Sequence, residues 1–579
     1  MSRNLLPLKN PGVKFRFATA DIESVKWTRF LTIGYFDGTD FRHFESLRKF
    51  FDHAFSNQCI HIFAHFGGIF DFLFLLKAAI SDSGYEIGSL IPRGSGILCF
   101  DLSRRSDGRV LHFHDSGALL PMSLKRITEA FKVTHSKKEI DYARISKVTP
   151  RLLEYLEYDC RGLYESLEKF YSDPLIEASG PKFTIASQAI QVLRTFLTEE
   201  VPACPRHIDP AIREAYAGGR TEIFKPLFQA LPRGPELMAY DFNSLYPAVM
   251  AEADEMPTRF KNITRTGDLD ETGFAEVTVT VPSSLYIPPL WVKNLNGKNK
   301  FIFPTGQVSG VYPTCELRRA VRAGCTVTKM RRFYRFANGG PFLRDFVRAL
   351  YSIRQRAENP VSNAIAKLLL NSSYGRLAIG LSKESLSFDD GRPGVTPFLE
   401  LKVGRHTTRL VKEVKPYNAF SNVAIGAWIT ALARIKLFDA LTISEKTVHY
   451  CDTDSIYSTD TLPVSGELGC LKLESSTRSA CFLLPKTYST REGNKMKGFD
   501  KKKIQHFQVE DFQHALQGDF SVLKIEEGPR MNRFKSAVRA GDLLSMGRAR
   551  SKQVRSLYDK RVLFQKPDGV WDSRPHHIE

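Results

Sequence analysis

Two segments far apart in the chain constrain its fold more than any other feature. Residues 240–247 (YDFNSLYP) read as a strand that delivers Asp241 into a turn, and residues 450–457 (YCDTDSIY) read as a hairpin whose tip presents Asp452 and Asp454. Carboxylates among apolar neighbours are costly to bury unless cations compensate their charge. An ordinary Asp-rich turn explains either segment alone, but not both with matching aromatic flanks. Together they predict a fold that joins them at one cation site.

A third segment, residues 363–378 (NAIAKLLLNSSYGRLA), lies between these two and predicts a helix. Lys367, Asn371 and Tyr374 recur in it at i, i+4 and i+7, so they share one continuous face. A helix with Lys and Tyr on one face is common, and its ordinary interpretation is a solvated surface. Its position between the two acidic segments favours a shared site instead.

Acidic residues also recur in the first 180 residues. Asp21 and Glu23 end an alternating strand and project to one face, while Asp71 lies in an apolar run directly after a glycine turn. Tyr155 and Asp159 follow at the helical i, i+4 spacing. Each element alone has an ordinary interpretation: a solvated pair, a capping or salt-bridged aspartate, and a solvated helical face. In this order, however, four acids can hold two cations of the kind that hydrolyse phosphodiesters.

These segments together resemble family B DNA polymerases, and several secondary motifs are similar to those of the protein-primed members found in phages and linear plasmids. KLLLNSSYG, residues 367–375, matches the family's fingers motif almost letter for letter. The resemblance covers nearly the whole chain. It implies an α/β (α+β) multidomain fold, in which an RNase H-like exonuclease domain precedes a right-hand polymerase of palm, fingers and thumb with two insertions. The implied activity is template-directed DNA synthesis with 3'→5' proofreading.

For the polymerase centre, the resemblance implies that Asp241 and Asp454 bridge two divalent cations and that Asp452 supports them. Nucleotidyl transfer needs one cation to lower the pKa of the primer hydroxyl and another to hold the triphosphate. Tyr246 matches the family's steric gate, whose ring clashes with a ribose 2'-hydroxyl. Deoxynucleotides are therefore the expected substrates.

The predicted helix is expected to meet the incoming nucleotide. Lys367 would neutralise the β- and γ-phosphates, Asn371 would lie near the nucleotide, and Tyr374 would stack near the nascent base pair. Arg354, in LYSIRQR, is a second candidate phosphate ligand, and a solvated arginine is the alternative. Arg434 also matches a palm position of the family.

For the exonuclease centre, the resemblance implies four metal ligands and one residue that positions the attacking water. The ligands are Asp21, Glu23, Asp71 and Asp159, and the water-positioning residue is Tyr155. Two cations held in this way activate a water and stabilise the leaving 3' oxygen.

Further exonuclease motifs are similar to those of protein-primed members. Lys137, just before EIDY, matches a catalytic lysine, and SLKRI places Ser123 and Leu124 in a single-strand-binding motif. The chain departs from the family at Phe66, where members usually carry an asparagine that contacts the frayed primer end. Phenylalanine cannot hydrogen-bond that strand, but it can stack on a base. Phe66 is therefore expected to contact DNA.

Two motifs outside both centres are also expected to bind DNA. Tyr216, Gly218 and Gly219 in AYAGGR match the linker motif that binds single-stranded DNA and coordinates the two activities. Lys486 and Tyr488 in LLPKTY match the Lys-x-Tyr motif near the primer terminus.

Two long intervals between the polymerase motifs exceed simple turns and predict structured insertions. In protein-primed members, the first docks the terminal protein and the second supports strand displacement and processivity. VTVTVP and KFIFPTG indicate that the first is folded, and the second is expected to form a β-hairpin around the Asp-Asp-Gly turn at residues 389–391. The expected division is: exonuclease 1–185, palm 186–256, first insertion 257–340, fingers 341–378, second insertion 379–415, palm 416–485, and thumb with a basic C-terminal region 486–579.

The charge of the chain supports a polyanionic partner. The formal net charge is +19, and the segment 530–566 alone carries eleven Lys and Arg against Asp542 and Asp559. Such a basic surplus favours nucleic-acid phosphates, with affinity that falls as salt rises. No membrane span or secretory signal is evident. Nine scattered cysteines without a CxxC pair favour reduced thiols. We therefore expect a location inside the host cell, in the cytoplasm or, for an organellar plasmid, the mitochondrion.

The expected cofactors are two Mg²⁺ or Mn²⁺ ions per active site. The expected partners are a DNA template-primer, deoxynucleoside triphosphates and a terminal protein, with a single-stranded-DNA-binding protein as a further candidate and the chain itself a monomer. One alternative is a polymerase that needs no primer or extends only oligonucleotides. An inactive nucleic-acid-binding protein is the alternative from another class, and the intact Asp241, Asp454 and Lys367 argue against it.

Overall fold

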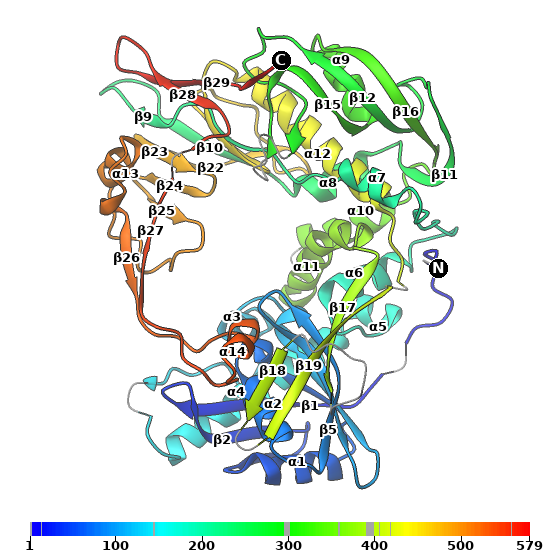
Figure 1. The fold of residues 1–579 in the computed structure, drawn as a ribbon, viewed down its shortest axis with the longest axis vertical. Helices are drawn as coiled ribbons and strands as arrows, with labels where there is room; N and C mark the ends of the chain where they lie inside the picture. The colour runs from blue at the N-terminus through cyan, green and yellow to red at the C-terminus, as the bar shows by residue number, and fades with distance from the viewer. Residues whose placement is uncertain are drawn as a thin grey trace.

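The computed structural model describes residues 3–12, 14–142, 145–293, 301–356, 359–389, 399–403, 406–416, 419–556 and 558–579. It is a mixed α/β structure of several sheets and cores. Figure 1 shows the N-terminal segments in blue at the bottom and two sheets with helix α12 at the top, while the orange and red C-terminal segment runs down one side to the blue part. Among the described residues, no helix is long and apolar enough to cross a bilayer.

A ten-stranded sheet organises the N-terminal lobe. Its strand β1 pairs antiparallel with β2 and parallel with β4, so β1 lies inside the sheet. Helix α4 packs on β1 and β2, and α2 packs on β5. Helix α4 begins with Thr149 accepting the Leu152 N–H, followed by Pro150, both of which favour a helix start. The elements of this lobe are β1 (Phe17–Val25), β2 (Arg29–Phe36), β3 (Phe41–Phe44), α1 (Leu47–Ser56), β4 (His61–Ala64), α2 (Asp71–Ile80), β5 (Tyr85–Arg93), β6 (Gly96–Arg104), β7 (Val110–Asp115), α3 (Leu124–Phe131) and α4 (Pro150–Tyr171).

A five-stranded sheet joins the two acidic segments in the upper part of the molecule. The order is β22-β10-β21-β20-β8, and its neighbouring strands are antiparallel. Helices α8 and α12 pack together, and both contribute to one large core. The elements are β8 (Thr221–Ile223), β10 (Leu237–Phe242), α8 (Leu245–Glu252), α12 (Val423–Ile443), β20 (Val448–Asp452), β21 (Ser455–Ser458) and β22 (Leu471–Thr477).

Helix α11 (Pro360–Leu377) contains the predicted helix at residues 363–378, except for Ala378. It begins where Asn359 accepts the Val361 and Ser362 N–H groups and proline occupies the first turn. Its Leu369 and Leu370 are buried in the large core. Helices α10 (Arg344–Arg356) and α6 (Ile185–Leu193) pack against it, while α5 (Pro174–Ser179) and α7 (Asp209–Glu214) complete the connection from the N-terminal lobe.

The first predicted insertion is folded, as VTVTVP and KFIFPTG indicate. Its sheet has the order β11-β16-β12-β15-β30 and a core of its own. Strand β12 buries alternate residues, the pattern of a strand with one covered face. Strand β30, from the C-terminal region, pairs in parallel with β15. The elements are β11 (Pro257–Thr264), β12 (Gly273–Val281), β13 (Val292–Lys293), β14 (Phe301–Ile302), β15 (Thr305–Pro313), α9 (Thr314–Arg322), β16 (Thr326–Asn338) and β30 (His577–Ile578).

The second predicted insertion is not a hairpin around its Asp-Asp-Gly turn. Strands β17 (Ser382–Asp389) and β18 (Leu399–Val403) flank that turn, yet both pair with β19 (His406–Pro416) rather than with each other. Part of the turn itself lies outside the described residues. The physical reason is the other edge of β17, which pairs with β5 and buries Leu386 in the N-terminal core. The insertion therefore extends the N-terminal sheet.

The C-terminal region contacts three different parts of the molecule. Its first sheet has the order β25-β24-β23-β9, so the expected boundary between residues 485 and 486 falls inside one sheet. Helix α14 then reaches the N-terminal lobe, where it contacts β6 and β18. The elements are β9 (Leu227–Gln229), β23 (Ser479–Leu484), β24 (Thr487–Thr490), β25 (Gly493–Met496), α13 (Val509–Leu516), β26 (Lys524–Glu527), α14 (Phe534–Arg539), β27 (Arg550–Gln553), β28 (Val562–Gln565) and β29 (Trp571–Arg574).

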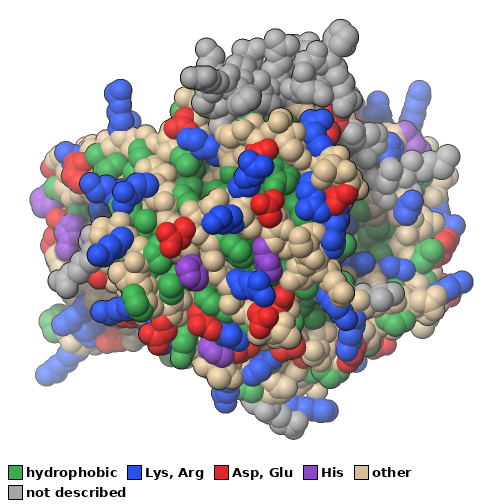
Figure 2. All heavy atoms as spheres, turned by 90° about the horizontal axis from the view of Figure 1, so that it is seen from below, with side chains coloured by type: hydrophobic (Ala, Val, Ile, Leu, Met, Phe, Trp, Pro, Cys, Tyr) green, Lys and Arg blue, Asp and Glu red, His purple; other side chains and the backbone are tan. Residues whose placement is uncertain are grey.

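The surface charge is not uniform in sign. Figure 2 shows the molecule from below, where lysine and arginine side chains are interspersed with acidic and histidine side chains. This face does not present a continuous basic surface.

Candidate active sites

The two acidic segments meet in the five-stranded sheet, as predicted. Asp241 lies opposite Ser455 in the pairing of β10 with β21, and the Phe242 N–H donates to the Asp454 carbonyl over 2.7 Å. The turn between β20 and β21 holds Thr453 in the left-handed region at φ 63°. This turn carries Asp452 and Asp454 to the end of β10. The sheet therefore brings acids from both segments together.

Asp241 and Asp454 carry charge that the site does not fully balance. Burial raises the pKa of Asp241 to about 6, and the nearby charges of Asp454 and Glu474 add to the shift. Burial also raises the pKa of Asp454, with a further contribution from Asp452. Raised carboxylate pKa values mean that the ionised forms repel each other and lack solvation. A divalent cation such as Mg²⁺ or Mn²⁺ would relieve both effects, so these residues fit a metal site.

Asp452 has protein partners instead. Its Oδ1 accepts a hydrogen bond from Thr221 Oγ1 over 3.1 Å and lies 3.1 Å from the Lys486 Nζ. Its side chain is only 6% exposed, and Lys495 approaches the other oxygen. Lys486 also anchors the motif in place, because its amide N–H donates to the Tyr450 hydroxyl. The Lys-x-Tyr motif thus lies directly on the strand that carries Asp452.

Tyr488 extends the same contact. Its hydroxyl lies 3.1 Å from that of Tyr457, which belongs to the neighbouring strand β21. The ring packs against Tyr450 and Phe482. Both members of the predicted motif therefore contact the aromatic residues of β20 and β21, the strands next to the aspartates.

The side chains predicted to meet the nucleotide lie along α8, α10 and α11. The rings of Tyr246 and Tyr374 stack with centroids 4.2 Å apart and an interplanar angle of 8°. Lys367 and Asn371 are exposed on α11, on the side away from its buried leucines. Arg354 is not simply solvated, since it donates to the Ser244 hydroxyl over 2.8 Å in the turn after β10.

The AYAGGR motif packs against the turn between β20 and β21 that carries Asp454. A Cβ on Gly219 would lie 2.7 Å from the Thr453 side chain, whereas a Cβ on Gly218 would meet nothing within 4 Å. Arg434 of α12 donates to the Ala217 and Gly218 carbonyls. Tyr216 packs near α12 at Gly426. Gly219 therefore has a structural role in positioning the aspartate turn, beside its predicted DNA contact.

The N-terminal lobe holds a second carboxylate cluster. Oxygens of Asp21, Glu23 and Asp159 all lie within 4.8 Å of one another. Burial raises the pKa of Glu23 to about 8, with the charge of Asp159 adding to it, and burial raises the pKa of Asp21 well above its ordinary value. Asp159 Oδ1 is buried without a hydrogen-bond partner in the described part of the chain. An orphaned oxygen between two further carboxylates fits a divalent cation.

The predicted lysine and tyrosine lie beside this cluster. The Lys137 Nζ contacts both Asp159 Oδ2 and the Tyr155 hydroxyl. The Tyr155 hydroxyl also contacts that of Tyr142 over 2.7 Å. Lys137 therefore connects the carboxylate cluster to the hydroxyl groups of Tyr155 and Tyr142. Tyr142 is half exposed, so this series of contacts reaches the surface.

Asp71 lies outside the group of three acids. Its Oδ1 accepts the Ile22 N–H over 2.8 Å, between the two acids of β1, and its side chain is buried at the start of α2. Burial raises the pKa of Asp71 to about 7, and its charge in turn raises the pKa of Asp21. Asp71 thus fixes the β1 backbone and adds negative charge to the cluster.

The remaining predicted DNA contacts have mixed surroundings. Ser123 caps α3 by accepting the Arg126 N–H and is itself exposed, whereas Leu124 is buried in the large core, so only Ser123 is accessible for the predicted DNA contact. Phe66 is 37% exposed in a left-handed conformation at φ 54°. A Cβ on Gly117 would lie 2.5 Å from its ring, which explains the glycine there.

Sequence reasoning missed Lys472, whose ammonium lies 3.5 Å from Asp241 Oδ2. It stands directly opposite Asp241 in the pairing of β10 with β22. Only the register of these strands could have identified it, because nothing in LKLESS marks the lysine. The aromatic pair Trp27 and Tyr142 was also missed, because its two residues lie far apart in the sequence and meet only in the folded chain.

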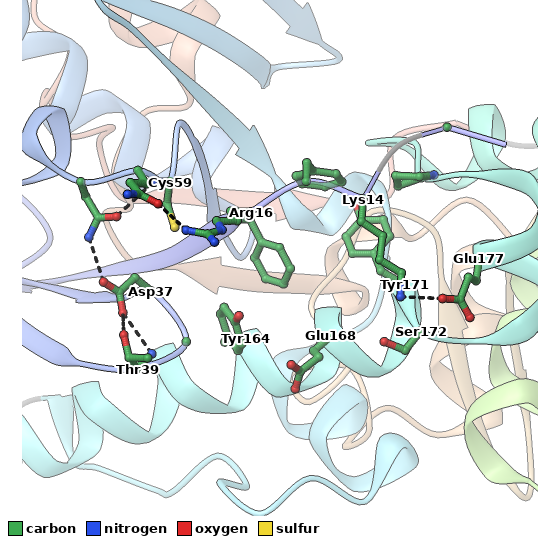
Figure 3. Close-up of a pocket in the computed structure, with 17 residues that line it drawn as sticks. Lys14, Arg16, Asp37, Thr39, Cys59, Tyr164, Glu168, Tyr171, Ser172 and Glu177 are labelled. Atoms are coloured by element: carbon green, nitrogen blue, oxygen red, sulfur yellow. Dashed lines mark hydrogen bonds and ion pairs between the residues drawn. The ribbon is translucent and has the colours of Figure 1, made fainter.

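A pocket of about 640 Å³ lies at the other end of β1 and α4 (Figure 3). Lys14 pairs with Glu177 at one side, and Asp37 accepts hydrogen bonds from Thr39 at the other. Burial opposes ionisation of Asp37, but hydrogen bonds from Thr39, Asp40 and Asn57 hold its pKa at about 2. The pocket contains none of the predicted site residues.

Comparison with known proteins gives consistent results. Residues 145–392 match the family described as DNA polymerase type B, organellar and viral. The DNA-directed DNA polymerase of Enterobacteria phage PRD1 is 28% identical over 456 residues, which cover 75% of this chain and 74% of that protein. A probable DNA polymerase of Ascobolus immersus is 26% identical over 77% of this chain, which spans only 41% of that protein's length.

The fold resembles solved structures along most of its length. The structure of phi29 DNA polymerase with primer-template DNA and incoming nucleotides has a TM-score of 0.73 and 20% identity, and the match covers 93% of this chain and 100% of that one. A binary complex of the same enzyme with primer-template DNA gives a TM-score of 0.74. The predicted α/β multidomain fold is thereby confirmed.

Proposed function

We propose that this chain is a DNA-directed DNA polymerase of the organellar and viral type B family, which residues 145–392 match, and that it adds deoxynucleotides to a primer. The observation that carries the proposal is the meeting of Asp241 and Asp454 at the end of β10, where their raised pKa values call for cations. Two bound Mg²⁺ or Mn²⁺ ions would activate the primer hydroxyl and hold the triphosphate. Asp452, already paired with Lys486, would support the turn that presents Asp454.

The incoming nucleotide would lie between this centre and α11. Lys367 is exposed and free to reach the phosphates, while Arg354 is oriented by Ser244 at the turn that follows Asp241. The stacked rings of Tyr246 and Tyr374 form a rigid pair, with Tyr246 only two residues beyond that turn. A rigid ring under the sugar leaves little room for a 2'-hydroxyl, which supports a preference for deoxynucleotides.

We extend the proposal to 3'→5' proofreading in the N-terminal lobe. Asp21, Glu23 and Asp159 would hold the cations, and Asp71 would maintain the β1 geometry. Lys137 would orient Tyr155 toward the attacking water and balance charge on Asp159. Because the two groups of carboxylates are carried by separate sheets, β1 in the ten-stranded sheet and β10 and β20 in the five-stranded sheet, we expect that either activity can be removed by mutation without the other.

Protein priming and strand displacement are the finer parts of the proposal. The first insertion has its own core and therefore offers a rigid surface for a terminal protein. The second insertion joins the N-terminal sheet through β17 and contacts α14 through β18. These contacts would hold it in a fixed position next to the N-terminal lobe. The partners of the whole protein would be a template-primer, deoxynucleotides, a terminal protein and a single-stranded-DNA-binding protein. The protein would act in the host cytoplasm or, for an organellar plasmid, in the mitochondrion.

Extension of a primed single-stranded circle tests the polymerase. The wild type is incubated with Mg²⁺ and deoxynucleotides and without accessory proteins, beside Asp454→Ala and the matched control Asp568→Ala, whose aspartate lies in an exposed turn. We expect products longer than one circle from the wild type and the control, and none from Asp454→Ala. A wild type that only shortens the primer would overturn the polymerase proposal.

Priming needs a separate test. The chain is co-expressed with the proteins encoded beside it, and the extract is supplied with a labelled deoxynucleotide. We expect one small protein to acquire nuclease-resistant label at a hydroxyl group. If no protein is labelled while oligonucleotides are extended, the proposal of protein priming fails. The alternative, a polymerase that uses only oligonucleotide primers, then replaces it.

A further inference from the structure

The turn between β1 and β2 is built in an unusual way. Lys26 and Trp27 both have left-handed backbones, at φ 49° and φ 69°, and the turn is closed by the Thr28 N–H donating to the Val25 carbonyl. Two-residue combinations of this kind are normally occupied by Asn and Gly, because a Cβ is disfavoured there. Local backbone preference therefore does not account for a tryptophan at this position.

Core packing does not account for it either. The Trp27 side chain is 52% exposed, and in the described part of the chain it belongs to none of the buried apolar clusters. By contrast, Trp291 and Trp428 are 4% and 1% exposed. An exposed indole in a disfavoured backbone conformation costs stability, a pattern typical of residues kept for binding.

Trp27 belongs to an aromatic edge that we define as Trp27, Phe70 and Tyr142. The Trp27 and Tyr142 rings are nearly parallel, with centroids 6.2 Å apart and an angle of 24°, and Phe70 meets Trp27 edge-on at 6.0 Å. Tyr142 is 50% exposed and Trp27 52%, so both residues of the parallel pair are accessible to solvent.

The aromatic edge adjoins the carboxylate cluster of the N-terminal lobe. The Tyr142 hydroxyl contacts that of Tyr155, Phe70 directly precedes Asp71, and Trp27 follows Glu23 by four residues on the same hairpin. Exposed Lys26 and Arg29 flank the indole and supply positive charge. Flat rings beside cations suit a flexible chain of bases and phosphates.

We propose that Trp27 is a positioning residue that stacks on an unpaired base of single-stranded DNA whose 3' end enters this cluster. The inference rests on the proposed proofreading function and deepens it. Stacking on an aromatic ring tolerates any base, as a proofreading site requires. Trp27 touches no reacting atom, so it acts by holding the strand in register with the carboxylates.

Steady-state kinetics on a single-stranded oligonucleotide test the role in the full chain. Trp27→Gly is the main variant, because glycine accepts φ 69° and keeps the turn. We expect KM to rise about tenfold with kcat nearly unchanged, as loss of one stacked base would give. Trp27→Tyr should restore KM, whereas Phe564→Ala, which removes a 39% exposed ring in the C-terminal region, should leave it unchanged. An unaltered KM in Trp27→Gly overturns the proposal.

Fluorescence provides a readout that does not depend on hydrolysis. With a chelator present, oligo(dT) should quench the wild-type emission, and most of this quenching should be absent in Trp27→Phe. An oligonucleotide with two abasic sites at its 3' end should quench less. If the wild type lacks exonuclease activity, the proofreading proposal fails, yet quenching confined to Trp27 would still support stacking. Equal quenching in wild type and Trp27→Phe would overturn it.

Discussion

Lys472 faces Asp241 across the pairing of β10 with β22, with its ammonium 3.5 Å from Asp241 Oδ2. The same ammonium lies 3.1 Å from Glu474. Both contacts are on the solvent side of the sheet, since the Lys472 side chain is 47% exposed. This lysine therefore competes with a divalent cation for the negative charge of the polymerase centre.

Removal of that competitor should strengthen metal binding. We expect Lys472→Ala to lower the Mg²⁺ concentration for half-maximal primer extension by about two- to fivefold, the range for an exposed ion pair. Lys472→Arg keeps the charge and should behave as the wild type. A Mg²⁺ titration of extension rates measures both, and a higher Mg²⁺ requirement in Lys472→Ala would contradict the competition.

The close contact between Gly219 and Thr453 should be intolerant of a methyl group. Gly219→Ala places a Cβ 2.7 Å from Thr453, so the aspartate turn must shift. We expect a loss of about 1–3 kcal/mol in stability and a drop in primer extension, while exonuclease activity persists. Gly528→Ala is the control, because a Cβ there meets nothing within 4 Å and Gly528 lies outside the predicted binding motifs. Equal extension rates for the two variants would show that the contact does not matter.

Lys137 should matter for proofreading alone. Lys137→Met leaves Asp159 buried without its cationic partner, and we expect exonuclease rates to fall about 100-fold with extension unchanged. Lys138→Met is the control, because Lys138 contacts Glu154 and lies over the Tyr158 ring, away from the cluster. Degradation of a labelled single strand measures the first activity. Parallel losses in both lysine variants would point to a general effect of charge.

Helix α14 should hold the C-terminal region against the N-terminal lobe during synthesis. Phe534 is 1% exposed in the N-terminal core, and Lys77 pairs with Asp542 over 2.9 Å. We expect Phe534→Ala to cost about 3–5 kcal/mol of this attachment. Product length per binding event should then shorten on a primed circle, while single-nucleotide insertion on a short template remains. Phe564→Ala, at an exposed ring, should keep long products.

The sequence predicted the acidic residues of the two centres better than the contacts that hold them in place. Asp241, Asp452 and Asp454 could be predicted together because the first two lie at the ends of short strands and Asp454 lies in the turn that follows, all among aromatic residues, which is a local pattern. Helix α11 could be predicted because its polar face recurs with helical spacing and Asn359 and Pro360 mark its start. These features depend on residues that are near in sequence.

Contacts between distant strands could not be predicted in this way. The β17 to β5 pairing depends on which edge of the N-terminal sheet is open, and the hairpin expected at residues 389–391 ignored that edge. Ser123 and Leu124 match a binding motif, but a helix cap and a core position use the same residue types. Asp71 illustrates a third limit, since its hydrogen bond to Ile22 depends on the packing of α2 on the sheet.

The N-terminal core has a consequence for how such enzymes evolve. Leu386 and Leu410 come from the second insertion and Phe534, Val538 and Leu543 from the C-terminal region, yet all are buried in the same core as β1 and α2. The first 185 residues therefore do not contain every side chain that fills their own interior. Genetic exchange of a proofreading module between two relatives would therefore have to replace three separate segments together. A single crossover after residue 185 would pair the sheet of one parent with core side chains of the other.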